Sequence, residues 1–360
     1  MAINYFQRRI EKLLNKIQEK EAFLIASPEE IYYFTGFTGE DSYLIIKKNE
    51  IAFFTDLRFV EQIKIEKKIE LNVYELPSHN RVITFIKDNL LKDRIETLFV
   101  SKKDLKFSFG ESLQLLLLEN MIELKDSDYV KKMREIKDEL EIEIIKQNLM
   151  LTELSYSLIL PLIKEDRTEI EIAGEIESFL RKNGSESMAF STIVASGERS
   201  VLPHGRATEK KIKRNEIILF DYGIKKNGYC SDFTRCYYFG KIISDEILKI
   251  HGVVKKALKA AEDVIKVGIP AREVHLAAWN VINREGYSSN FWHSTGHGVG
   301  LEIHEEPAIS EKSETILQEG MVFAVEPGIY LPGVGGIRLE DMVVVRKDGV
   351  EILTTTEYDL

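Results

Sequence analysis

Residues 218–240 read ILFDYGIKKNGYCSDFTRCYYFG, two apolar runs on either side of the polar turn KKNG. Apolar runs that flank an Asn-Gly pair predict a β-hairpin. If the whole tetrapeptide forms the loop, Asp221 lies opposite Asp232. If only Asn227-Gly228 forms it, Asp221 faces Thr234 and Asp232 is its diagonal neighbour. Both registers put two carboxylates on one face with Cβ atoms about 5–8 Å apart, and such a pair favours a cation between them. The alternative is a solvent-facing hairpin with scattered acids.

A second hairpin weakens that alternative. Residues 320–349 read GMVFAVEPGIYLPGVGGIRLEDMVVVRKDG, two apolar strands around a Pro/Gly-rich turn. Centring the turn on Gly333 places Glu326 opposite Glu340. Glu340 also follows Arg338 at the period of a strand, so these two side chains project from one face. Two hairpins that each present a pair of carboxylates favour a metal site over chance.

The segment between the hairpins, residues 291–307, reads FWHSTGHGVGLEIHEEP. His293 and His297 have the i, i+4 spacing of helical zinc sites, but three alternating glycines argue against a helix. The glycines instead predict a backbone packed tightly against its surroundings, with His297 held among them. Strand parity over residues 299–303 predicts a strand that leads to His304. For any one of these histidines, a purely structural role is the alternative.

The five candidate metal ligands are four acids and one imidazole: Asp221, Asp232, His297, Glu326 and Glu340. Four carboxylates carry four negative charges, which two divalent cations neutralise. Oxygen-rich ligation favours manganese, cobalt or iron over a thiolate-type zinc site. Cys230 and Cys236 share strand parity with Asp232, but their spacing matches no zinc-finger pattern.

The chain is expected to form two domains. Up to about residue 125 the pattern alternates strand and helix, as in a modest α/β domain. Residues 126–142 are dense in mixed charge and lead into a long amphipathic helix. Strands that carry acids and helices at about 244–266 and 270–285 follow. We therefore expect an α+β protein with an N-terminal α/β domain at 1–128 and a C-terminal domain at 129–360.

The composition limits the classes of partner and the compartment. The 360 residues carry a formal net charge of -10, which disfavours binding to nucleic acid. Only two cysteines occur, which is typical of a reducing compartment. The charged N-terminus lacks the apolar core of a signal peptide, and no run of 18 apolar residues predicts a membrane span. We expect a cytoplasmic protein.

The motifs LFDYG, GYCSDFTR, STGHGVG, IHEEP, VEPGIY and GIRLED, in this order, resemble those of the prolidase and aminopeptidase P branch of the pita-bread metallopeptidases. FSTIVASGERSVLPHGRAT resembles the stretch just upstream in that branch. The resemblance is close over residues 130–360 and looser in the first domain, through YYFTGFTGEDSYLII and FFTDLRFVEQ. It implies a C-terminal pita-bread domain behind a smaller creatinase/prolidase N-terminal-like domain. Met342 departs from the pattern, since the family often has a second acid there.

This resemblance also implies roles for the site residues. Asp221 and Asp232 on one side and His297 on the other would hold two divalent ions, manganese or cobalt with iron or zinc as alternatives. Glu340 would bridge the ions, and a metal-bridging hydroxide would be the nucleophile. The catalytic residues would be His204, at the leaving nitrogen, His304, at the carbonyl oxygen, and Glu326, as ligand and proton carrier. The substrate-binding residues would be His293 and Arg338, with Thr234 supporting the ligands.

The implied substrate is a small peptide with proline at its second position, cleaved as an Xaa-Pro dipeptide or from the N-terminus of a longer peptide. The sequence does not distinguish these two. A methionine aminopeptidase shares the five ligands, but the separate first domain and the Pro-His-Gly stretch favour the proline branch. A metal-free creatinase-like hydrolase or a non-catalytic peptide- or histone-binding module would have lost the ligands. The family also implies a homodimer.

Overall fold

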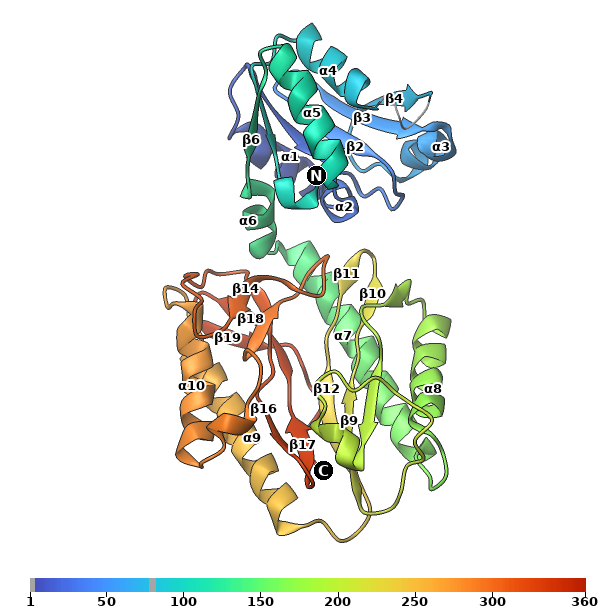
Figure 1. Ribbon diagram of the computed structural model, residues 1–360, viewed down its shortest axis with the longest axis vertical. Coiled ribbons are helices and arrows are strands. Elements are labelled where there is room, and N and C mark those ends of the chain that lie inside the picture. Colours follow the sequence, from blue (N-terminus) through green and yellow to red (C-terminus); the bar gives the residue numbers. More distant parts are fainter. Residues whose placement is uncertain (1–3, 78–81) are drawn as a thin grey trace. The chain divides into compact units, whose positions relative to one another are not determined.

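The computed structural model describes residues 4–77 and 82–360 (Figure 1). The chain divides into two compact units, Met1–Met133 and Arg134–Leu360. The break falls inside helix α6 (Tyr129–Glu135), a few residues after the boundary expected at residue 128. The first unit has one sheet and the second has several, and each unit has its own apolar core.

The first unit is built on one six-stranded sheet in the order β4-β3-β2-β1-β5-β6. Its strands are β1 (Glu21–Ile25), β2 (Tyr43–Lys47), β3 (Ile51–Asp56), β4 (Asn72–Leu76), β5 (Thr97–Val100) and β6 (Glu123–Asp126). Its helices are α1 (Tyr5–Leu14), α2 (Pro28–Thr35), α3 (Leu57–Glu66), α4 (Val82–Lys92) and α5 (Phe107–Glu119). The central strands pair antiparallel and the outer ones parallel, so the expected α/β character is confirmed.

The second unit places its strands between two pairs of helices (Figure 1). The helices are α7 (Glu139–Ile159), α8 (Glu169–Lys182), α9 (Asp245–Val264) and α10 (Ala271–Arg284). The early strands are β7 (Ser187–Met188), β8 (Ile193–Ser196), β9 (Glu216–Asp221), β10 (Ile224–Lys226), β11 (Tyr229–Cys230) and β12 (Thr234–Phe239). The later strands are β13 (Gly296–Gly298), β14 (Glu305–Ile309), β15 (Val322–Val325), β16 (Gly328–Leu331), β17 (Gly335–Arg338), β18 (Asp341–Arg346) and β19 (Gly349–Ile352).

The strands of this unit form short sheets in the orders β11-β10-β7, β12-β9-β8, β14-β13-β15-β18-β19 and β16-β17. The helices expected at about 244–266 and 270–285 are α9 and α10. Their apolar faces join the sheets in one core, which includes Ile250 and Val254 of α9 and Phe323 of β15. The unit is therefore α+β, as expected.

Capping residues fix where the helices of the second unit begin. Asp138 closes a capping box with Glu141 at the start of α7, and Thr168 closes one with Glu171 at the start of α8. Each box satisfies backbone N–H groups that have no partner inside the helix. Helix α8 ends at Lys182, just before Asn183-Gly184.

Two structural facts relate to the expected lack of a membrane span and to the expected reducing compartment. Across residues 4–77 and 82–360, no helix has the length and apolar content that crossing a membrane would need. Cys230 and Cys236 are both buried thiols.

Candidate metal centre

The first hairpin closes on a two-residue turn. Lys226 pairs with Tyr229, and the turn residues Asn227-Gly228 have φ of 51° and 76°. Positive φ at both positions is the geometry that Asn-Gly favours in tight hairpins. Further along the ladder, Asp221 lies opposite Thr234 across β9 and β12. Of the two registers that the sequence allows, the second is therefore the one that forms.

The second hairpin has the expected register. Val325 lies opposite Asp341 across β15 and β18, so the next pair beyond these two strands is Glu326 and Glu340. The β16–β17 ladder continues with the same pairing sum toward a turn at Gly333, whose φ is 80°. The structure confirms the turn and the opposition of the two glutamates that follows from it.

His297 lies in β13 between two glycines that allow very close backbone contact. A Cβ atom at Gly296 would lie 1.8 Å from the carbonyl oxygen of Ala324, and one at Gly298 would lie 2.3 Å from that of Glu306. No side chain fits at either position. The expectation of tight packing around His297 is confirmed.

The strand expected over residues 299–303 does not form. The chain bends there, and the next strand, β14, begins at Glu305 and pairs back with β13. The carbonyl oxygen of Gly300 instead accepts a hydrogen bond from the backbone N–H of Cys230, 2.7 Å away. This long-range contact overrides the local alternation of apolar residues, and His304 ends a loop, not a strand.

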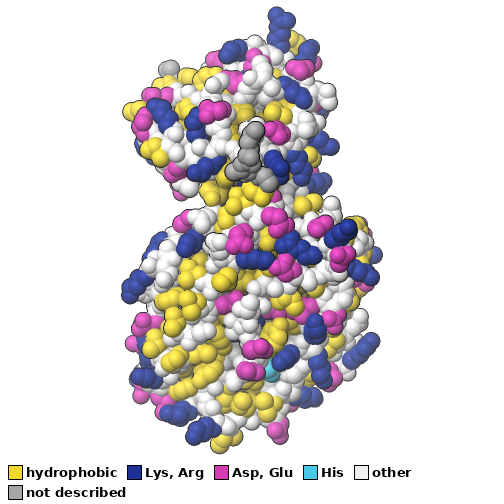
Figure 2. All heavy atoms as spheres, turned by 180° about the vertical axis from the view of Figure 1, so that it is seen from behind, with side chains coloured by type: hydrophobic (Ala, Val, Ile, Leu, Met, Phe, Trp, Pro, Cys, Tyr) yellow, Lys and Arg dark blue, Asp and Glu magenta, His cyan; other side chains and the backbone are white. Residues whose placement is uncertain are grey.

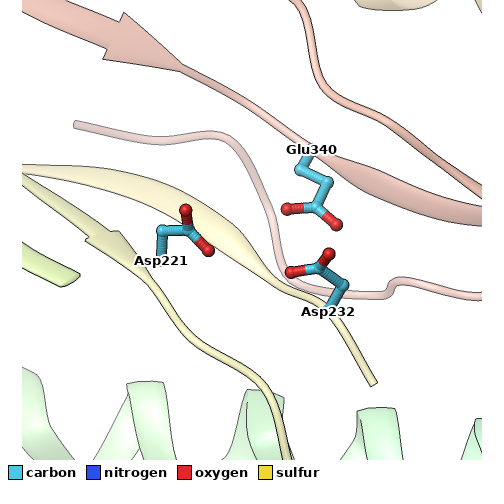
Figure 3. A group of neighbouring side chains, drawn as sticks. All are labelled: Asp221, Asp232 and Glu340. Carbon is cyan, nitrogen blue, oxygen red and sulfur yellow. The ribbon is translucent and has the colours of Figure 1, made fainter. Parts of the chain in front are cut away.

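The structure brings the five candidate ligands together. Oxygen atoms of Asp221, Asp232 and Glu340 lie within 4.8 Å of one another (Figure 3). The Nε2 atom of His297 lies 3.5 Å from an Asp232 oxygen and 3.7 Å from a Glu326 oxygen. Four carboxylates and one imidazole, far apart in sequence, therefore surround one small volume.

These carboxylates are crowded together, and their negative charges repel one another. Burial and the neighbouring carboxylates raise the pKa of Asp232 and of Glu340 well above the ordinary values. Burial also raises the pKa of Glu326. The Oε1 atom of Glu340 is buried and accepts no hydrogen bond from the part of the chain that the structure describes. An orphaned carboxylate oxygen among crowded acids fits a divalent cation, for which oxygen donors are suited.

Arg338 supplies positive charge beside this cluster. It is 2% exposed, and its Nη2 atom donates to Oδ2 of Asp221. Its Nη1 atom donates to the hydroxyl of Tyr330 at 2.8 Å and to the carbonyl oxygen of Pro203 at 3.2 Å. Its Nε atom lies 3.7 Å from Glu326. One guanidinium offsets the charge of only one of the four carboxylates, so cations are still needed to neutralise the others.

The cluster opens into a cavity of about 480 Å³. Four candidate ligands line it, and Glu340 lies behind them with 2% exposure. The other expected site residues also line this cavity: His204, His293, His304 and Arg338. The residues singled out for chemistry therefore share one pocket or its floor.

Three histidines of the pocket favour the neutral form, although His293 and His297 are only partly buried and His304 is exposed. Burial lowers the pKa of His293, His297 and His304. The Nε2 atom of His293 lies 2.8 Å from the Tyr330 hydroxyl and its Nδ1 atom lies 2.7 Å from the Ser294 carbonyl oxygen. The rings of His297 and His304 lie 4.3 Å apart between centroids. Neutral imidazoles can act as metal ligands or as hydrogen-bond donors.

Among the residues that the structure describes, the acidic cluster includes neither of the two cysteines. Burial raises the pKa of the Cys236 thiol to about 11, and its sulfur lies 3.5 Å from the carbonyl oxygen of Arg338. The group is therefore a thiol at neutral pH, which does not favour thiolate ligation. Met342, the departure from the family pattern, is buried, and its sulfur accepts from the backbone N–H of Asp232 at 3.3 Å.

Sequence reasoning did not single out Tyr330, which contacts two pocket residues from behind the surface, or Arg206 and Phe190, which line the pocket. Tyr330 links His293 to Arg338 through its hydroxyl, and its strand parity with Glu326 is a signal that could have found it. Arg206 and Phe190 line the cavity. Arg206 stands two residues after His204, so its position beside a candidate catalytic residue was also a signal.

Comparison with known proteins places the two units in known families. Residues 143–347 match the model of metallopeptidase family M24, and residues 9–136 match the creatinase/prolidase N-terminal domain. Together these matches extend over both units of the fold.

Known relatives match over nearly their full lengths. The chain is 36% identical to the Xaa-Pro dipeptidase of Pyrococcus furiosus, over 98% of this chain and 99% of the relative. Among solved structures, the X-Pro aminopeptidase from Thermotoga maritima is 37% identical with a TM-score of 0.89, covering 98% of this chain and 100% of that one. The Xaa-Pro dipeptidase from Bacillus anthracis is 34% identical with a TM-score of 0.92, covering 99% of each chain.

Proposed function

The chain belongs to metallopeptidase family M24, and on that premise we propose that it is a metalloexopeptidase that hydrolyses the bond between an N-terminal residue and a following proline. This proposal rests on the convergence of the five candidate metal ligands at one pocket. They are Asp221, Asp232, His297, Glu326 and Glu340. The names of several relatives, which are Xaa-Pro dipeptidases or an X-Pro aminopeptidase, support the proline preference.

Divalent metal ions are implied by the family, and we propose that these five side chains hold two of them. Two divalent cations match the four negative charges of the carboxylates. An oxygen-rich set with one imidazole favours manganese or cobalt, with iron and zinc as alternatives. When bound, such ions would lower the pKa of water to near neutrality and polarise the scissile carbonyl.

The other pocket residues would act on the substrate. Glu326 would carry a proton from the attacking water toward the leaving nitrogen. His304 would donate a hydrogen bond to the carbonyl oxygen as negative charge develops there, and His204 would contact the leaving nitrogen. His293 would contact the proline end of the substrate, where Arg338 contributes positive charge.

A dedicated pocket suits the chemistry of the substrate. The bond before proline is a tertiary amide without an N–H group, so an enzyme cannot hold it through that donor. Histidines around the leaving nitrogen would replace the missing contact. The trans isomer, which is the more abundant one, is the expected substrate.

The proposal is tested by metal removal and readdition. We expect the purified protein to hydrolyse Ala-Pro, to lose this activity with a chelator, and to regain it with Mn²⁺ or Co²⁺. Preferential cleavage of Met-Ala-Ser would indicate a methionine aminopeptidase instead. Retained metal with no hydrolysis of either peptide would favour a non-catalytic binding protein.

We also propose a homodimer in the cytoplasm. Apolar side chains gather along the back of the second unit (Figure 2). On the outer face of α7, Met150, Leu154 and Leu158 are 64%, 50% and 50% exposed, and an apolar row of this kind is suited to an interface. Buried thiols suit a reducing compartment. Light scattering on the purified protein tests the oligomeric state.

A further inference from the structure

A row of paired residues crosses the sheet from the candidate metal centre to Arg206. Ile193 lies opposite Asp221 in the β8–β9 ladder, and it also forms an isolated bridge with Arg206. Directly opposed residues project their side chains from the same face. Two strand spacings, about 10 Å, separate the backbones of Asp221 and Arg206. All three residues line the pocket.

The guanidinium of Arg206 is available to a ligand. Arg206 is exposed at the pocket, and among residues 4–77 and 82–360 no hydrogen bond or ion pair engages its guanidinium. Arg338, the other arginine of the pocket, is buried and already donates to Asp221 and Tyr330. A planar guanidinium binds a carboxylate through two parallel hydrogen bonds, and of these two arginines only Arg206 has that fork free.

The backbone that carries Arg206 is firmly anchored. Its carbonyl oxygen accepts a hydrogen bond from Nη2 of Arg199 at 2.7 Å. The Nε atom of Arg199 in turn lies 3.0 Å from Glu169, whose side chain is fully buried. Glu169 also accepts from Ser196 and Thr208, on either side of Arg206 in the sequence. The exposed guanidinium therefore extends from a fixed point.

We propose that Arg206 binds the free carboxylate of a proline at the C-terminus of the substrate, so that the enzyme selects unblocked Xaa-Pro dipeptides over longer peptides. This inference rests on the proposed function. In such a dipeptide the carboxylate lies about 4 Å, one residue, beyond the scissile carbonyl. With that carbonyl near Asp221, the carboxylate falls between the two ends of the row, within reach of an extended arginine side chain. A longer peptide has a neutral amide there.

The test compares Ala-Pro with Ala-Pro-amide on the metal-loaded enzyme and three variants. For the wild type we expect a higher kcat/KM on Ala-Pro. In Arg206→Gln, the ratio of kcat/KM for Ala-Pro to that for Ala-Pro-amide falls about 10- to 100-fold, as expected for a lost charged hydrogen bond. The loss lies mainly in KM, because the contact exists before and during the reaction. Arg206→Lys keeps part of the preference, since it keeps the charge without the fork.

Lys211→Gln is the matched control for charge. Lys211 is an exposed cation five residues further along that pairs with Asp166 and does not line the pocket. It should leave the ratio unchanged. A ratio that stays constant in Arg206→Gln, or that falls equally in Lys211→Gln, overturns the inference while the proposed function stands. A wild type that hydrolyses neither substrate overturns the proposed function and the inference with it.

Discussion

The guanidinium of Arg338 donates from Nη2 to Oδ2 of Asp221, and the two side chains are only 3% and 13% exposed. One carboxylate oxygen of Asp221 points toward Asp232 and Glu340 (Figure 3). Arg338 therefore orients a candidate ligand as well as offsetting its charge.

Arg338→Lys separates these two effects, because lysine keeps the charge and loses the fork. We expect the affinity for Mn²⁺ to fall about 10- to 100-fold, the usual effect of removing a group that orients a ligand. Competition with a metal-binding dye measures it. An affinity equal to that of the wild type would mean that Asp221 holds its orientation without Arg338.

Asp232→Asn removes one charge from the crowded acids with little change of shape. We expect the variant to lose bound metal and Ala-Pro hydrolysis. In the metal-free state its melting temperature should equal or exceed that of the metal-free wild type, because one buried carboxylate no longer repels its neighbours. Elemental analysis and thermal unfolding measure these effects. Metal content at the parent level would exclude Asp232 as a ligand.

His304→Ala tests a donor to the developing negative charge. We expect turnover to fall by about 100-fold or more, which is typical of a missing transition-state donor, with metal content unchanged. His251→Gln is the control, since this histidine of α9 contacts the Tyr358 carbonyl oxygen and does not line the pocket. Parent-level turnover in His304→Ala would remove His304 from the catalytic residues.

The sequence predicts those parts of the site that local patterns determine. Apolar runs around an Asn-Gly turn located the first hairpin, and apolar runs around a Pro/Gly-rich turn located the second. Counting from Gly333 placed Glu326 opposite Glu340. The register of the first hairpin stayed open between two loops, because the same residues allow either. The positive φ at both Asn227 and Gly228 selects the shorter loop.

Long-range contacts account for the features of the site that local sequence patterns did not predict. The strand expected over residues 299–303 gave way to a bend because Gly300 bonds to Cys230 in another sheet. The hydroxyl of Tyr330 joins Arg338, on the paired strand β17, to His293, which lies 37 residues earlier in the sequence. No spacing along the chain encodes the contact of Gly300 with Cys230 or that of Tyr330 with His293.

Arg235→Met should strongly destabilise the second unit. Arg235 and Asp341 are 1% and 0% exposed, and their side chains lie 3.0 Å apart. Arg235 also donates to the carbonyl oxygens of Thr356 and Glu340. Removing one partner of a buried ion pair leaves the other charge uncompensated, at a cost of about 3–5 kcal/mol. Urea unfolding measures it. Adding Asp341→Asn should recover part of the loss, and no recovery would mean that packing dominates.

The first unit contains a carboxyl group whose titration is coupled to folding. Burial raises the pKa of Glu50, but hydrogen bonds from Lys47, Tyr74 and two asparagines outweigh it and lower the pKa from 4.5 to about 2. The Lys47 ammonium lies 2.8 Å from the Glu50 carboxylate, and its side chain is fully buried. The folded state therefore holds the Glu50 proton less tightly than the unfolded state does.

Because the folded pKa is the lower one, Glu50 contributes its full stability above about pH 4.5 and loses it as the pH falls toward 2. Allowing for solvent screening, we expect a contribution on the order of 2 kcal/mol. In Glu50→Gln the decline of stability over this acid range should be shallower, as measured by urea unfolding at several pH values. Glu61→Gln, at a side chain that is 79% exposed, is the control and should keep the parent slope. If both variants follow the parent curve, the acid sensitivity of the first unit arises from other groups.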